Sequence, residues 1–240
     1  MTGIDHPTRA AQRPVALVTG AARGLGAAVA QALDDAGWAV AGLDLAPCAT
    51  TLSLQGDVTD AAAVAHAVSA VERDLGPIDA LVTVAGIYEQ APIDDITDAR
   101  WERILAVNVG GTINACSAVL PFMLARGAGA IVTISSDLGV GGSQGDVHYS
   151  ATKGAIVGFS RSLARELITD GIVVNTVAPG AADTAMLAAD SPWRADSFLQ
   201  TLPIPRLVRP DEIAGAVLFL LEAGGSMVGQ LISPNSGATI

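Results

Sequence analysis

The sequence contains a single lysine. Lys153 is one of 13 basic residues, and the other 12 are arginines. Cysteine and aromatic residues are scarce as well, at two cysteines and 4% aromatic residues. Cys48 and Cys116 lie far apart in the chain and match no metal-ligand spacing, which predicts two buried thiols and no metal site.

Positive charge is in short supply. The 24 acidic residues outnumber the basic ones and give a net charge of -11, which argues against binding to nucleic acid or to an anionic membrane surface. No apolar run reaches the roughly 18 residues that a membrane span needs. Residues 1–13 lack the apolar segment of a signal peptide, so we expect a flexible tail on a cytoplasmic protein.

Apolar residues, in contrast, make up half of the chain. Continuously apolar strand-like segments alternate with amphipathic helix-like ones and show no break in composition. This pattern predicts a single-domain α/β fold over residues 14–240, a Rossmann-type doubly wound parallel sheet with helices on both faces. The expected strands are 14–20, 38–45, 51–55, 78–86, 129–136, 171–180 and 228–233, and the expected helices are 24–37, 60–76, 98–126, 149–169 and 209–224.

Residues 181–208 interrupt the alternation. This insert is longer than an ordinary connection, yet it carries Trp193, Phe198 and other apolar residues. A long apolar insert is typical of a functional loop rather than of disorder. We therefore predict a lid over an apolar substrate pocket.

A glycine-rich turn, TGAARGLG, joins the first strand to the first helix. Gly20, Gly24 and Gly26 let the backbone turn tightly, and the helix start behind them offers free N–H groups to a pyrophosphate. Three glycines alone are a weak signal, but their position after the first strand makes the prediction of a dinucleotide site a strong one.

Asp44 ends the second expected strand. A carboxylate there can accept hydrogen bonds from ribose hydroxyls and would repel a 2′-phosphate, which favours NAD over NADP. Arg23 acts in the opposite sense, because a cation in the glycine turn could meet that phosphate. Alternatively, Arg23 could pair with Asp44.

Lys153 follows Tyr149, one of two tyrosines, by four residues. On a helix these positions share one face. An ammonium beside a phenol is expected to lower the phenol pKa toward working pH, where the phenol can act in proton transfer.

Taken in order, the motifs resemble those of the short-chain dehydrogenase/reductase family, in particular its 3-oxoacyl-carrier-protein-reductase-like members. The matching segments cover essentially the whole chain. They are TGAARGLG at 19–26, DV at 57–58, VAG at 84–86, Asn108 in AVNVGGT, Ser136 in ISS, YSATK at 149–153, PG at 179–180, RPDEIA at 209–214 and GQ at 229–230.

The resemblance implies an oxidoreductase that moves a hydride between NAD(H) and a secondary alcohol or ketone, with the tyrosine as general acid/base. It implies a homotetramer or homodimer. It implies a catalytic tetrad of Asn108, Ser136, Tyr149 and Lys153. The implied cofactor-binding residues are Gly20, Arg23, Gly24, Leu25, Gly26, Asp44, Asp57, Val58, Ala85, Gly86, Asn108, Tyr149, Lys153, Pro179, Gly180, Ala182 and Thr184.

Two other functions fit the motifs. One is an NADPH-dependent 3-oxoacyl-carrier-protein reductase, and the other is a dinucleotide-binding sensor without catalysis. We expect His148 to lie at a helix start or line the pocket rather than act as a base. We assign no chemistry to Asp137 and Asp146, and we expect Tyr88 to be part of a wall or of the surface.

Overall fold

The computed structural model describes residues 13–222 and 226–239. Its strands are β1 Val15–Thr19, β2 Ala39–Asp44, β3 Leu52–Gln55, β4 Ile78–Thr83, β5 Gly129–Ile134, β6 Ile172–Val177 and β7 Leu231–Ile232. Its α-helices are α1 Gly24–Asp35, α2 Ala61–Asp74, α3 Asp98–Leu105, α4 Gly111–Arg126, α5 Leu138–Gly141, α6 Val147–Leu167, α7 Asp196–Leu199 and α8 Pro210–Glu222. A π-helical turn, Ala106–Gly110, links α3 to α4, and short 3₁₀ turns occupy Ile93–Asp95, Ile168–Asp170 and Pro192–Arg194.

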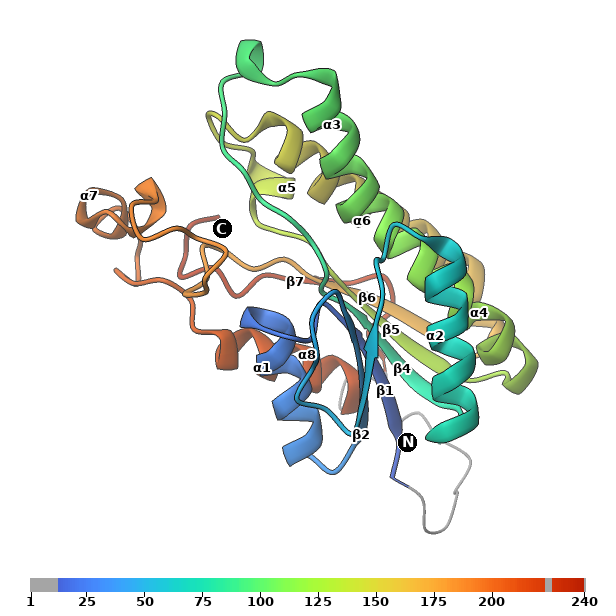
Figure 1. Ribbon diagram of the computed structural model, residues 1–240. Coiled ribbons are helices and arrows are strands. Elements are labelled where there is room, and N and C mark those ends of the chain that lie inside the picture. The colour runs from blue at the N-terminus through green and yellow to red at the C-terminus, as the bar shows by residue number, and fades with distance from the viewer. Residues whose placement is uncertain (1–12, 223–225, 240) are drawn as a thin grey trace.

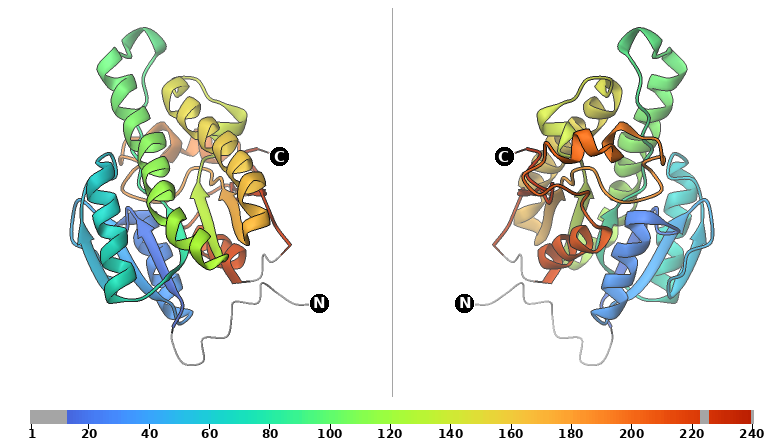
Figure 2. Two further views of the ribbon diagram at one scale, coloured as in Figure 1. Left: turned by 90° about the vertical axis from the view of Figure 1, so that its right-hand side faces the viewer. Right: turned by 90° about the vertical axis from the view of Figure 1, so that its left-hand side faces the viewer.

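All seven strands belong to one sheet in the order β3-β2-β1-β4-β5-β6-β7. Every neighbouring pair is parallel. Helices α1 and α8 lie on one face of the sheet, and α2, α4 and α6 lie on the other (Figures 1 and 2). The predicted fold class, a doubly wound parallel α/β sheet, is confirmed.

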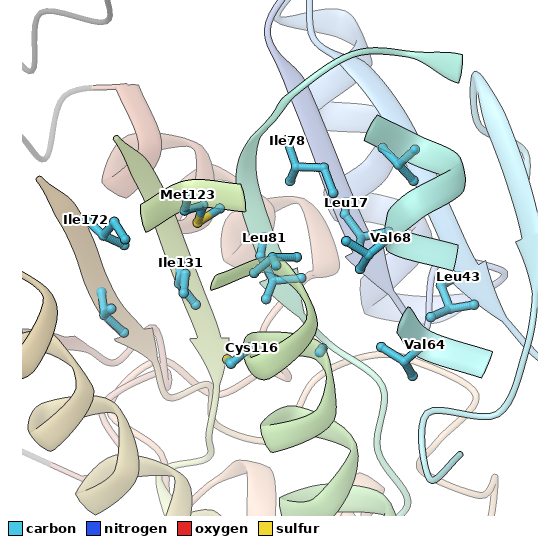
Figure 3. Packing of buried hydrophobic residues seen from close by; sticks show 14 of the residues in the cluster. Leu17, Leu43, Val64, Val68, Ile78, Leu81, Cys116, Met123, Ile131 and Ile172 are labelled. Atoms are coloured by element: carbon cyan, nitrogen blue, oxygen red, sulfur yellow. The ribbon is translucent and has the colours of Figure 1, made fainter. Parts of the chain in front are cut away.

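The core has one apolar layer on each face of this sheet. Figure 3 shows the layer beneath α2 and α4, where Leu81 and Ile131 of the sheet lie near Val68 and Met123 of the helices. Cys116 is part of this layer. Because burial disfavours a thiolate, its pKa is raised to about 12.

Both cysteines are free and buried, as predicted. Cys48 packs in the layer on the opposite face. Among the described residues, no group of three or more His, Cys, Asp or Glu side chains is arranged to hold a metal ion.

The strand order reverses between β1 and β4, which leaves a crevice at their carboxyl ends. Parallel sheets bind ligands at such a switch point. Thr19 fixes the two strand ends together, because its hydroxyl oxygen accepts hydrogen bonds from the N–H groups of Val84 and Ala85, at 3.1 and 3.2 Å. The fold thereby places the glycine turn after β1 beside the loop after β4.

The helical run Asp98–Arg126 is long and apolar enough to cross a membrane by length and composition, and 39% of its most apolar window is buried. Its α4 part packs on α2, β4 and β5, as core helices of globular folds do. One such helix is weak evidence for a span, and the expected lack of membrane contact stays a prediction.

The structure adds local helices that the sequence did not predict. Residues 181–208 hold the 3₁₀ turn Pro192–Arg194 and α7, although we predicted an irregular insert. Ser191 helps to start the first of these, since its hydroxyl accepts a hydrogen bond from the N–H of Trp193 at 3.4 Å. Residues 1–12 of the expected tail lie outside the described part of the chain.

Candidate active site

A cleft of about 930 Å³ opens at the carboxyl ends of the central strands and is bordered by residues 181–208. The predicted site residues that line it are Gly20, Arg23, Gly24, Leu25, Gly26, Asp44, Asp57, Val58, Ala85, Gly86, Ser136, Tyr149, Lys153, Pro179, Gly180, Ala182 and Thr184. Asn108 is fully buried just behind the wall. One cleft therefore brings together residues spread over most of the chain.

The glycine turn forms a cradle that side chains would fill. Gly20 and Gly24 adopt left-handed φ angles of 70° and 57°. A Cβ atom on Gly20 would lie 2.7 Å from the Cα of Ala85, and one on Gly26 would lie 2.0 Å from the carbonyl oxygen of Gly20. Helix α1 starts behind this turn without a side-chain cap, so the helix end is suited to an anionic group such as a pyrophosphate.

Asp44 lies at the end of β2 and faces the same turn. Its carboxylate accepts hydrogen bonds from the N–H groups of Ala22 at 3.0 Å and Ala46 at 3.2 Å. Arg23 is exposed, and the ion pairs found in residues 13–222 and 226–239 do not include the Arg23–Asp44 pair that we considered. The carboxylate is therefore oriented by the backbone.

Further along the cleft, Val58 is held by helix α4. The side-chain amide of Asn114 donates to its carbonyl oxygen at 2.9 Å, and Gly111 leaves room for it, since a Cβ there would lie 2.6 Å from a Val58 methyl carbon. Asp57 is exposed beside it. Both residues line the cleft.

Tyr149 and Lys153 lie one turn apart near the start of α6. The Lys153 Nζ atom is 5.7 Å from the centre of the Tyr149 ring, and it donates a hydrogen bond to the carbonyl oxygen of Ile134 at 3.0 Å. The Ser135 hydroxyl donates to the backbone carbonyl of Lys153 at 2.7 Å. The end of β5 thus holds Lys153 by both its side chain and its backbone.

The prediction that the pKa of Tyr149 is lowered is wrong for the cofactor-free protein. Burial raises this pKa above its ordinary value, the neighbouring Ser136 hydroxyl lowers it, and negative charge at Asp137 contributes to the rise. Burial also lowers the pKa of Lys153 to about 8. Desolvation disfavours both charged forms here, and sequence spacing carries no information about desolvation.

Asn108 sits in the π-helical turn between α3 and α4. Its side-chain oxygen accepts from the N–H of Ile87 at 2.8 Å, and its amide donates to the Ile87 carbonyl and to the Thr152 hydroxyl, both at 3.0 Å. Gly86 packs closely on it, because a Cβ at Gly86 would lie 3.1 Å from the Asn108 oxygen. The side chain therefore joins the loop after β4 to α6, and π turns are frequent at functional sites.

Thr152 is a residue that the sequence reasoning missed. Besides accepting from Asn108, its hydroxyl donates to the backbone carbonyl of Tyr149 at 2.7 Å. It lies inside the YSATK segment, directly before Lys153. The signal available in the sequence was its spacing, because Thr152 follows Tyr149 by three residues and such positions share one helix face.

Ser136 lies two residues after the end of β5. Its hydroxyl donates to the Asp137 carboxylate at 3.1 Å and accepts from the N–H of Leu138 at 3.2 Å. A weaker contact at 3.4 Å reaches the carbonyl of Pro179 in the loop after β6. We had given Asp137 no chemistry, yet it lines the cleft and contacts the serine expected to orient the substrate.

His148 is fully buried and is not among the residues that line the cleft. Its Nε2 atom lies 3.1 Å from a Glu89 oxygen, and its ring meets Trp101 edge-on with centroids 5.9 Å apart. Although His148 adjoins Tyr149 in sequence, its imidazole therefore points away from the cleft. This agrees with the expectation that His148 is not a catalytic base, whereas pocket lining is not observed.

The 181–208 segment supplies an apolar wall of Met186, Leu187, Trp193 and Phe198. Its start also reaches the glycine turn, since a Cβ on Gly24 would be in ordinary contact with Thr184 at 3.6 Å. The Arg194 guanidinium is bound within the segment, where it contacts Asp183, the Thr184 carbonyl and the Leu187 carbonyl at 2.8–3.2 Å.

The comparisons agree with this geometry. A family described as short chain dehydrogenase matches residues 14–195. An acetoacetyl-CoA reductase from Shinella zoogloeoides is 39% identical over 93% of this chain and 97% of its own length. A D-threitol dehydrogenase from Mycolicibacterium smegmatis is 39% identical over 89% and 88%. The crystal structure of gox2181 superposes with a TM-score of 0.89 at 32% identity, over 95% of this chain and 96% of that one.

Proposed function

Because the chain belongs to the short-chain dehydrogenase family, we propose that it is an oxidoreductase that transfers a hydride between NAD(H) and a secondary alcohol or ketone. One observation carries the proposal. The half-buried Tyr149 phenol and the buried Lys153 ammonium and Ser136 hydroxyl all line the cleft that begins at the glycine cradle. A dinucleotide bound there supplies the hydride chemistry, and the residues around it handle the proton and the substrate oxygen.

Tyr149 is the general acid of reduction and the general base of oxidation. Since burial raises its pKa, the phenol is fully protonated at neutral pH and can donate a proton to a forming alkoxide. For oxidation the phenolate has to form, and the Lys153 ammonium on the same helix face stabilises that charge. Ser136 lines the cleft, and its one O–H, which donates to Asp137 in the structure, would turn to donate to the substrate oxygen.

We assign the remaining predicted residues to the cofactor. Gly20, Gly24 and Gly26 give the pyrophosphate a backbone cradle, and the uncapped start of α1 favours its charge. Asp44, fixed by two backbone N–H groups, supports NAD because a 2′-phosphate would lie beside a carboxylate. Asn108 positions Lys153 through Thr152, which precedes Lys153 in α6 and accepts a hydrogen bond from the Asn108 amide at 3.0 Å.

The substrate end of the cleft supports a substrate that is neutral near its reacting carbon. Arg194 is the segment's cation nearest to the apolar wall, and its hydrogen bonds are made to groups of its own segment. Asp137 adds a carboxylate at the opposite side. An aliphatic or alicyclic ketone or alcohol suits these surroundings better than a carboxylate.

The proposal includes the organisation of the chain. Residues 14–240 form one catalytic domain with residues 181–208 as its lid, and the enzyme is a cytoplasmic homotetramer or homodimer. Ile113 and Leu124 are exposed on one face of α4, about three turns apart, and support self-association, because apolar residues that share an exposed face are typical of an interface. Light scattering of the purified protein tests it, and a monomer at micromolar concentration contradicts it.

The test of function follows NADH absorbance with a panel of ketones, and NAD⁺ reduction with the matching alcohols. Tyr149→Phe should lower turnover by at least about 1,000-fold, since the proton donor is lost, while NADH binding measured by fluorescence changes less than about twofold. Normal turnover by Tyr149→Phe would refute the mechanism. No turnover by the wild type with any carbonyl compound would favour a sensor.

A second function has support from the relatives. The 39% identity to an acetoacetyl-CoA reductase favours reduction of a 3-oxoacyl thioester as the alternative, with NADPH as the expected reductant. Assaying acetoacetyl-CoA with each reduced cofactor separates the two. A higher kcat/KM with acetoacetyl-CoA and NADPH than with any simple ketone and NADH would replace the first proposal by the second.

A further inference from the structure

Tyr88 connects two distant parts of the chain at the substrate end of the cleft. It follows β4, and its hydroxyl lies 2.6 Å from the indole Nε1 of Trp193, 105 residues away. An indole N–H can only donate, so the Tyr88 oxygen is the acceptor. Both side chains are partly buried and line the cleft.

This hydrogen bond differs from the other hydrogen bonds of the segment in where its partner lies. Throughout the part of the chain that the structure describes, the other hydrogen bonds of residues 184–202 end within 181–208. Among these hydrogen bonds, the Trp193–Tyr88 bond is the one that joins residues 184–202 to the rest of the fold. Trp193 is itself stiffened by an edge-on contact with Phe198, with ring centroids 4.7 Å apart.

The other side of Tyr88 contacts the reaction centre. Its ring meets that of Tyr149 edge-on, with centroids 4.9 Å apart and an angle of 84° between the planes. Such aromatic pairs have a preferred geometry and resist rotation. Tyr88 therefore limits how the catalytic phenol can swing away from the substrate.

The Tyr88 hydroxyl keeps a proton of its own to donate. Burial raises the Tyr88 pKa, and so does the nearby Asp146 carboxylate. Asp146 is fully buried directly before α6, and the Tyr88 hydroxyl in turn lowers its pKa. The hydroxyl that accepts from the Trp193 N–H therefore lies near a buried carboxylate before α6, although the Asp146 carboxylate oxygens make no hydrogen bond within the described residues.

We propose that Tyr88 is a positioning and specificity residue: its hydroxyl latches residues 184–202 over the substrate through Trp193, while its ring braces Tyr149. This inference rests on the proposed function for its effect on catalysis. Compact ketones and alcohols that fit beneath the closed segment benefit from the latch, and bulky substrates that hold it open do not. We call the Trp193–Tyr88 hydrogen bond the aromatic latch.

The experiment compares Tyr88→Phe, Trp193→Phe and the double variant. Both substitutions keep an aromatic ring and remove one partner of the bond. Each single variant should raise the KM of a compact ketone about 5- to 10-fold, as expected for one lost hydrogen bond, with a smaller change in kcat. The double variant should be no worse than the poorer single variant, because the same bond is lost. Trp101→Phe is the matched control, since Trp101 packs on His148 outside the cleft.

Limited trypsin digestion gives a readout without turnover. Cleavage after Arg194, inside the latched stretch, should be about 5- to 10-fold faster in all three latch variants and unchanged in the control. Cleavage after Arg206 serves as the internal reference, and NADH affinity should stay within about twofold.

Several outcomes would overturn the inference. They are single-variant KM values within about twofold of wild type, fold-changes that multiply in the double variant, or Arg194 cleavage that is no faster. If the wild type turns over no ketone, the proposed function fails, while the digestion still decides whether the latch exists. If Tyr149→Phe abolishes turnover but the latch variants behave as wild type, the function stands and the latch is wrong.

Discussion

The two ends of the cleft are built in different ways. The glycine turn at residues 19–26 is fixed by backbone atoms, with so little space that a Cβ on Gly26 would lie 2.0 Å from the Gly20 carbonyl oxygen. The ends of the 181–208 segment are held by backbone hydrogen bonds, whereas residues 184–202 are joined to the rest of the fold by the side-chain bond of Trp193 to Tyr88, and Arg194 bonds within the segment.

The difference teaches which part of the function can vary. A backbone cradle tolerates almost no substitution and recognises a group shared by all dinucleotides. A segment held by a few side-chain hydrogen bonds can be refitted by single substitutions, each costing roughly 1 kcal/mol. The chemistry is thus built into the fold, whereas the choice of substrate is left to residues that are easy to exchange.

The largest effect should come from filling the cradle. Gly26→Ala places a methyl group against the backbone of Gly20, which we expect to cost about 3 kcal/mol of stability and to weaken NADH binding at least about 100-fold. Denaturant unfolding and fluorescence titration measure both. Gly215→Ala in α8 is the control, because nothing lies within 4 Å of a Cβ there. Equal behaviour of the two variants would show that the turn is pliable.

The next largest effect is expected at Lys153, in the pH dependence of stability. Its pKa is about 8 in the fold and about 10.4 in an unfolded chain. Between pH 8 and 9.5 the amine therefore binds more protons in the unfolded chain than in the fold, so the contribution of Lys153 to stability should rise with pH, by at most about 1.4 kcal/mol per unit. The two thiols act in the opposite sense, because burial raises the pKa values of Cys48 and Cys116 in the fold.

Lys153→Met should remove this contribution, so the stability of the wild type relative to the variant should rise with pH, and the variant should also lose turnover. Urea unfolding of the wild type and the variant at pH 7, 8, 9 and 9.5 measures the slopes. The range stops at 9.5 because tyrosines of the unfolded chain titrate near pH 10, while burial raises the pKa values of Tyr88 and Tyr149 in the fold. Parallel stability curves for the two proteins would contradict the buried, shifted amine.

A smaller effect is expected at Asp44, the side chain that we assign to the choice between NAD and NADP. Asp44→Asn removes the charge that opposes a 2′-phosphate, so the ratio of kcat/KM for NADH over NADPH should fall about 10- to 100-fold. Steady-state kinetics with both cofactors measure it. Asp57→Asn, which also neutralises a carboxylate lining the cleft, should leave the ratio within about threefold. An unchanged ratio of kcat/KM in Asp44→Asn would mean that Asp44 does not contact the ribose hydroxyls of the cofactor.

The smallest effect is expected in the substrate segment. Arg194→Ala removes three hydrogen bonds inside it, but these groups can turn to water, so global stability should fall by about 1 kcal/mol or less. The KM of a compact ketone should rise about threefold. Thermal unfolding and kinetics test this, with Arg209→Ala as the exposed control. A loss of stability as large as that of Gly26→Ala would erase the contrast between the two ends.

Much of the cofactor end could be predicted because its determinants are local in sequence. The doubly wound parallel sheet was predicted from the alternation of apolar segments, the cradle from glycines after the first strand, and the Tyr149–Lys153 pair from helical spacing. Each depends on residues within a few positions of one another, so the pattern alone predicts the contact.

The rest depends on burial and on long-range packing. The pKa of Tyr149 was predicted in the wrong direction because the environment of a phenol cannot be read from its neighbours in the chain. The π turn at Asn108 and the partners of Tyr88 and Asp137 were likewise not predicted, since they are set by contacts between separate elements. The role of the predicted site residues in catalysis stays a prediction for the experiments above.

The end of β5 has a mechanical consequence. Ile134, Ser135 and Ser136 follow one another there, and together they anchor the lysine amine, anchor its backbone and present the serine hydroxyl. A central strand paired on both sides is among the stiffest parts of a protein, so these proton-handling groups are carried as one rigid block. Under the proposed function, reactants can then come and go through deformation of the opposite wall, without realigning the amine and the hydroxyl at every turnover.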